Sequence, residues 1–125
     1  VDDAPQAWNE RYEHYLGIKP PSHSDGILQD VHWSAGLVGY FPTYTLGNLY
    51  AAQLMEAMQR ELGELVPLVA SGQFQPLLSW LRGTIHEHGA CYHPVKLIEN
   101  ACAQTLDARP LVKYLRDKLT PIYEL

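Results

Sequence analysis

Residues 42–62 read PTYTLGNLYAAQLMEAMQREL, and this stretch decides the fold class. A proline is tolerated in the first turn of a helix, and apolar side chains then recur every three or four residues. We expect a long helix that starts after Pro42 and buries one apolar stripe. The residues of this stripe are Ala51, Leu54, Met55, Met58 and Leu62.

A second helix is expected near the N-terminus. Asp3 is a residue type that caps helices, Pro5 suits a first turn, and Gly17 suits an end. Its expected apolar face carries Trp8, Tyr12, Tyr15 and Leu16. Residues 18–26 read IKPPSHSDG, a composition that predicts a loop.

The chain after residue 62 predicts four more helical segments and no strand. A short one runs from about Glu64 to Gly72, and another ends at Gly89. Pro94 opens a third, and Asp107 caps the last. Their expected inward faces are Phe74, Leu77, Leu78, Leu81 and Ile85; Leu97, Ile98, Ala101 and Cys102; and Leu111, Leu115, Leu119 and Ile122. The sequence therefore predicts an all-α fold, with residues 1–125 as a single helical fragment.

Composition excludes several classes of function. The net charge is −5 and no lysine or arginine cluster appears, so we expect neither nucleic acid nor a membrane as partner. The acidic N-terminus does not resemble a signal peptide, and we expect a cytoplasmic location. Cys91 and Cys102 are expected to be free, buried thiols, although a disulfide between them stays open. The first residue, Val1, suits a piece of a longer protein.

Residues 26–50 read GILQDVHWSAGLVGYFPTYTLGNLY and lack helical periodicity at their start. Gln29, Asp30, His32 and Trp33 lie within five positions. A carboxylate that accepts a hydrogen bond from one imidazole nitrogen fixes the tautomer and orients the ring. We therefore expect Asp30 to lie within reach of the His32 ring, or to bond the backbone amides that hold this loop. The alternative is a polar loop that only packs on the helices.

The run from Gly26 to Trp33 fits the pattern GxxQDxHW at every fixed position. This pattern resembles the signature of the Taq-type thermostable metallocarboxypeptidases, a family of HExxH zinc enzymes. The run GYFPTYTLGNLYAAQ at residues 39–53 and the run GTIHEHGACY at residues 83–92 also resemble that family. The similarity extends from about Trp8 to Tyr123, and it resembles the C-terminal quarter of such an enzyme.

The resemblance implies an all-helical enzyme with a deep groove and a zinc ion at its floor. Such enzymes remove single residues from the C-terminus of peptides, with broad specificity and poor cleavage next to proline, and are commonly homodimers. Two histidines of HExxH and a downstream glutamate hold the zinc, and the HExxH glutamate is the general base. The partners implied are a peptide substrate and the missing N-terminal part of the same protein.

The zinc motif itself is absent from this chain. The only His-Glu pair is His86-Glu87, and residue 90, where HExxH requires histidine, is alanine. The HPF-like and DxRxT-like runs of the family are also absent. The cluster of His86, His88, Cys91 and His93 has poor spacing for a tetrahedral site, so we expect no zinc on this chain and no activity from it in isolation.

What the resemblance implies for this chain is a wall of the groove opposite the metal. In related helical HExxH peptidases, a histidine and a tyrosine twelve residues later bind the scissile carbonyl as it becomes an oxyanion. His32 and Tyr44 are twelve residues apart, and we predict them as catalytic. Gln29, Asp30, Trp33 and Tyr40 are predicted to bind substrate.

Two questions stay open from the sequence. A carboxypeptidase needs an arginine for the substrate carboxylate, and the sequence does not select one of Arg11, Arg60, Arg82, Arg109 and Arg116. The alternative to the enzyme is a stand-alone helical interaction module without catalysis.

Overall fold

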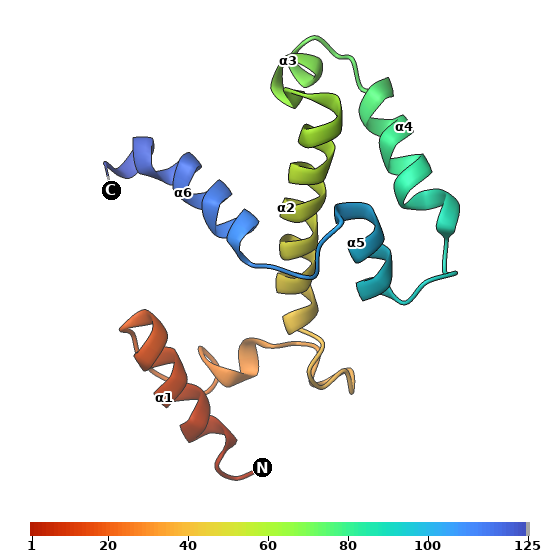
Figure 1. Ribbon diagram of the computed structural model, residues 1–125. Coiled ribbons are helices and arrows are strands. Elements are labelled where there is room, and N and C mark those ends of the chain that lie inside the picture. Colours follow the sequence, from red (N-terminus) through yellow and green to blue (C-terminus); the bar gives the residue numbers. More distant parts are fainter. Residues whose placement is uncertain (125) are drawn as a thin grey trace. The chain divides into compact units, whose positions relative to one another are not determined.

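The computed structural model describes residues 1–124, and within them every regular element is a helix (Figure 1). The all-α prediction is confirmed. The elements in chain order are α1 (Ala4–Leu16), η1 (Ile27–Gln29), α2 (Pro42–Leu62), α3 (Leu65–Ala70), α4 (Gln75–Thr84), η2 (His86–His88), α5 (Pro94–Cys102) and α6 (Arg109–Tyr123), where η marks a 3₁₀ turn. Across residues 1–124, no helix is long and apolar enough to cross a membrane.

The chain divides into two units, and the first comprises Val1–Thr43. Its main helix, α1, has Pro5 in the first turn and ends at Gly17, which adopts a left-handed φ of 68°. Two expectations hold only in part. Asp3 is the residue at the cap position, but its side chain makes no capping hydrogen bond. Tyr15 and Leu16 are exposed, at 69% and 57%, so the predicted apolar face is not buried at its C-terminal end.

The second unit starts at Tyr44 and contains a core built on α2. In Figure 1 the chain leaves the end of α2 through α3, reverses, and returns as α4 and then α5. Met58 of α2 and Trp80 of α4 belong to one buried cluster with Ile98 and Cys102 of α5. The indole Nε1 of Trp80 also donates a hydrogen bond to Glu61 Oε2 at 2.9 Å, which ties α4 to α2.

The buried side of α2 differs from the predicted stripe. Ala51 and Met55 are exposed, whereas Ala57 and Gln53 are buried. Gln53 is 0% exposed because its amide serves the linker between α5 and α6. Its Nε2 donates to the carbonyl oxygen of Thr105 at 2.9 Å, and its Oε1 accepts from the backbone N–H of Asp107 at 3.0 Å. A buried polar side chain is stable when its hydrogen bonds are satisfied in this way.

The helix expected to run to Gly89 ends earlier. At Ile85 the backbone leaves helical geometry, with φ −122° and ψ −58°, and η2 follows as a tighter turn. Short 3₁₀ turns are frequent at helix C-termini because they satisfy some of the last carbonyl groups. His86 and His88 therefore lie in a separate turn rather than in the last turn of α4.

The last helix has no fully buried residue. Of its predicted inward face, Leu111 and Leu119 are half-buried, whereas Leu115 and Ile122 are exposed, so this prediction is right only in part. The capping expectation is right in part. Ala108 is the residue at the cap position, but Asp107 Oδ1 accepts a hydrogen bond from the backbone N–H of Arg109 at 2.9 Å. The side-chain hydrogen bond from Arg109 also holds the pKa of Asp107 below its usual value.

Both cysteines are free thiols. The expectation of burial is confirmed for Cys102, which is 1% exposed, and wrong for Cys91, which is exposed. Burial raises the pKa of the Cys102 thiol, against the attraction of the Arg60 guanidinium. The same guanidinium donates to the carbonyl oxygen of Cys102 at 2.8 Å.

Candidate functional site

The site begins at Gly26, which is buried and precedes η1. A Cβ atom added to Gly26 would lie 3.1 Å from Pro20 Cβ and 3.4 Å from the carbonyl oxygen of Ser22. Any larger residue must therefore push the preceding proline loop away. Next to it, Ile27 is 7% exposed and anchors the turn. The first fixed glycine of the pattern thus has a packing reason in the first unit.

Gln29 lies at the end of η1, and its side-chain amide donates a hydrogen bond to the carbonyl oxygen of Ser24. This bond closes the loop that leads into Asp30. Gln29 is exposed, and its predicted contact with substrate stays a prediction.

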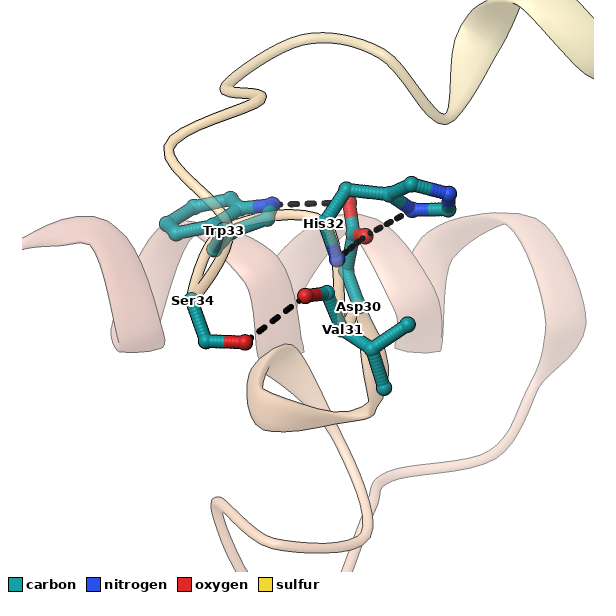
Figure 2. Close-up of polar contacts among 5 residues, drawn as sticks. All are labelled: Asp30, Val31, His32, Trp33 and Ser34. Carbon is teal, nitrogen blue, oxygen red and sulfur yellow. Dashed lines mark hydrogen bonds and ion pairs between the residues drawn. The ribbon is translucent and has the colours of Figure 1, made fainter.

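Asp30 is the centre of the polar arrangement in Figure 2. Its Oδ1 accepts from the backbone N–H of His32 at 3.0 Å and is 2.7 Å from His32 Nδ1. Its Oδ2 accepts from Trp33 Nε1 at 2.7 Å. The bond to the amide two residues later is the local turn that aspartate favours. The expected contact between Asp30 and the His32 ring is therefore present.

The Asp30 carboxylate is held in its charged form. Its side chain is only 8% exposed, and burial raises the pKa, but the hydrogen bonds from His32 and Trp33 outweigh burial and leave the pKa below 3.8. An ionised carboxylate can only accept hydrogen bonds. The hydrogen in the 2.7 Å contact therefore belongs to His32 Nδ1.

Two aromatic rings of the same unit lie against His32. The ring of Tyr40 is 4.9 Å from the imidazole between centroids, and the ring of Phe41 is 5.9 Å away in an edge arrangement. The structure thus brings Asp30, His32, Trp33 and Tyr40 together. The sequence does not single out Phe41, although it lies next to Tyr40 in the family-like run.

Tyr44, the second predicted catalytic residue, lies near the start of α2 and is 54% exposed. It belongs to the second unit, where Tyr50 packs against the buried cluster. The catalytic role of His32 and Tyr44, and the substrate contacts of the neighbouring residues, stay predictions.

Two of the five candidate arginines make internal contacts. Arg60 bonds the end of α5, and Arg109 pairs with Asp107. Within residues 1–124, no three histidine, cysteine, aspartate or glutamate side chains lie together so that they could hold a metal ion. In the histidine-rich segment, His88 instead contacts Tyr92, with ring centroids 5.4 Å apart.

Comparison with known proteins places the chain in a family. Thermostable carboxypeptidase 1 of Thermus thermophilus is 48% identical over 122 residues, which cover 98% of this chain and 24% of that protein. Carboxypeptidase 1 of Bacillus subtilis is 44% identical over 125 residues, which cover 100% of this chain and 25% of that protein. The crystal structure of an M32 carboxypeptidase from Deinococcus radiodurans R1 matches with a TM-score of 0.89 and 41% identity, over 99% of this chain and 25% of that one.

The model of the family described as Carboxypeptidase Taq (M32) metallopeptidase matches residues 1–119. The chain belongs to this family, as the GxxQDxHW run predicted. It spans about a quarter of the length of the curated relatives it matches.

Proposed function

We propose that this chain is the C-terminal part of a zinc-dependent carboxypeptidase that removes single residues from the C-terminus of peptides. The observation that carries the proposal is the family match over residues 1–119, together with relatives that are named carboxypeptidases. No observation favours the alternative of a stand-alone interaction module.

In this proposal the chain supplies hydrogen-bond donors to the scissile carbonyl, and His32 and Tyr44 are those donors. Donors held in place before the reaction stabilise negative charge on the carbonyl oxygen without reorganising. The support from the structure is the fixed orientation of His32, whose Nδ1 is bonded to Asp30 at 2.7 Å. Gln29, Trp33 and Tyr40 line the substrate side of the same loop.

The remaining parts of the proposal concern the whole enzyme. Zinc is held by residues of the polypeptide that this chain does not include, and the enzyme works in the cytoplasm as a homodimer. The chain forms part of the wall of the groove in which the peptide is bound, and it has no activity by itself.

The test uses the full-length gene product and an N-blocked dipeptide. We expect release of the C-terminal amino acid, loss of the activity with a chelator, and recovery with zinc. The 125-residue chain alone, assayed beside it, is the control and should release nothing. Full-length protein that leaves the blocked dipeptide intact in the presence of zinc would contradict the proposal.

A further inference from the structure

Residues 33–41 form a loop that is attached to His32 at both ends. At its start, the carbonyl oxygen of His32 accepts a hydrogen bond from the backbone N–H of Leu37 at 2.9 Å. At its end, the rings of Tyr40 and Phe41 lie against the imidazole, with centroids 4.9 Å and 5.9 Å away. The tip of the loop is therefore held close to His32.

The backbone of the tip requires glycine on both sides. Gly36 and Gly39 have φ angles of 75° and 80°, in the left-handed region that glycine enters without the steric cost other residues meet. The backbone N–H of Tyr40 donates to the carbonyl oxygen of Leu37 at 3.2 Å and closes the turn. Leu37 and Val38 thus lie in a hydrogen-bonded turn between two glycines.

The two side chains at the tip are apolar and exposed. Leu37 is 48% exposed and Val38 is 76% exposed. Tight turns usually carry glycine, proline, asparagine, aspartate or serine, so two neighbouring aliphatic side chains are unusual there. Residues 33–41 also include no charged residue. A ligand that contacts this tip is therefore recognised by an apolar group and not by a charge.

We propose that Leu37 and Val38 are specificity-determining residues, which contact an apolar side chain on the penultimate residue of the peptide substrate. This inference rests on the proposed function, in which His32 binds the carbonyl oxygen of the scissile bond. That carbonyl belongs to the penultimate residue, whose Cα is bonded directly to the carbonyl carbon, whereas the Cα of the C-terminal residue lies beyond the nitrogen. The tip is bonded to the backbone of the same histidine, and it offers the penultimate side chain an apolar surface.

The first experiment measures kcat/KM of the full-length, zinc-loaded enzyme for two pairs of N-blocked dipeptides. One pair has leucine or asparagine at the penultimate position before a C-terminal alanine. The other pair has alanine at the penultimate position and leucine or asparagine at the C-terminus. Burial of apolar surface favours leucine, whereas asparagine loses its hydration in the same contact. We expect the wild type to prefer penultimate leucine about tenfold or more, the usual range for discrimination by an apolar contact.

Two variants add polar atoms to the tip and keep the shape of the side chain approximately. Val38→Thr and Leu37→Asn should each lower the preference for penultimate leucine by about threefold or more, because the apolar contact is weakened. The preference at the C-terminal position should not change. Val66→Thr is the matched control, because Val66 lies on α3 in the second unit and is 72% exposed, and both of its preferences should equal those of the wild type.

Three results would overturn the proposal. The first is a wild-type preference for penultimate leucine in both active tip variants. The second is a change confined to the C-terminal position, because the tip then contacts the released residue. The third is a lower melting temperature of both variants with unchanged preferences, because Leu37 and Val38 then pack against another part of the protein.

The second experiment needs no activity. Leucine and valine methyl groups of the full-length protein are labelled with ¹³C, zinc is removed with a chelator, and the two tip variants assign the signals of Leu37 and Val38. We expect the blocked dipeptide with penultimate leucine to shift both signals, and the one with penultimate asparagine to shift them less. Signals of Leu37 and Val38 that stay in place at every peptide concentration would refute the inference even if the enzyme is active. The expected shifts without hydrolysis by the zinc-loaded enzyme would instead refute the proposed function.

Discussion

Replacing Gln53 by leucine tests how the buried amide holds the linker between α5 and α6. The change keeps the volume and apolar packing of the side chain approximately and deletes both hydrogen bonds, to Thr105 at 2.9 Å and from Asp107 at 3.0 Å. A buried donor or acceptor left without a partner costs about 1–3 kcal/mol. Thr105 is exposed and can regain water, so we expect the Asp107 amide to account for most of the loss, about 2 kcal/mol.

The readout is native-state hydrogen exchange of the segment from Ala103 to Ala108 in the full-length protein. A loss of about 2 kcal/mol in local opening free energy speeds exchange roughly 30-fold. Gln59→Leu is the matched control, because Gln59 is exposed on the same helix, and exchange of the segment should not change. Gln53→Leu with wild-type exchange at Asp107 would refute the reasoning that Gln53 holds the linker.

Three further predictions concern Tyr44, Trp80 and the two cysteines. Tyr44→Phe in the full-length enzyme should lower kcat by about 10²–10³ with little change in KM, whereas Tyr40→Phe should lower kcat less than tenfold. Steady-state kinetics measure both variants. A larger loss of kcat for Tyr40→Phe than for Tyr44→Phe would mean that Tyr40 is the donor. Trp80 is 8% exposed, and Trp80→Phe removes the hydrogen bond from its indole to Glu61. The free energy of unfolding measured by urea titration should fall by about 1–3 kcal/mol. An unchanged midpoint of unfolding would contradict this. Exposed Cys91 should react with a thiol reagent well before buried Cys102 at pH 8, and equal reaction rates would contradict this. Because burial raises the pKa of Cys102, its contribution to stability is complete below the ordinary pKa of 9.0 and is lost as pH rises through the higher pKa of the folded state.

The stability of the fold should also depend on pH through Asp30, with a sign opposite to that of Cys102. Its pKa in the folded chain lies below the ordinary value of 3.8, because hydrogen bonds from His32 and Trp33 outweigh burial. The folded state therefore gains stability above pH 3.8, and this gain is lost as pH falls from 3.8 through the lower folded value. Acid unfolding followed by circular dichroism should show a smaller loss between pH 5 and pH 2 for Asp30→Asn than for the wild type. An identical acid limb in the two proteins would contradict it.

The parts of this molecule that the sequence predicts well depend on near neighbours in the chain. The helix after Pro42, the left-handed end at Gly17 and the contact between Asp30 and His32 each involve residues only a few positions apart. Such contacts follow from backbone geometry and side-chain length, so a pattern in the sequence is enough to foresee them. The family pattern added what local geometry does not carry, because it identified the family to which the chain belongs.

Most of the errors concern burial, which depends on distant partners. Gln53 is fully buried because a linker more than fifty residues later needs both ends of its amide, and nothing near Gln53 in the sequence reveals this. Met55 on the same helix fits the apolar period and is 48% exposed. Helical periodicity identifies a face that is suitable for burial, but which face is buried depends on the surfaces available to cover it.

The same reasoning separates what was predictable for His32 from what was not. The sequence placed a carboxylate two residues before the ring, and that spacing was enough to expect an oriented imidazole. The sequence did not show which of the two ring nitrogens Asp30 contacts, and in the structure it is Nδ1. Because Nδ1 lies against a carboxylate whose Oδ2 is bonded to Trp33, the neutral ring carries its hydrogen on Nδ1. A turn of four residues thus converts a general expectation about a histidine into a specific tautomer that spectroscopy can measure.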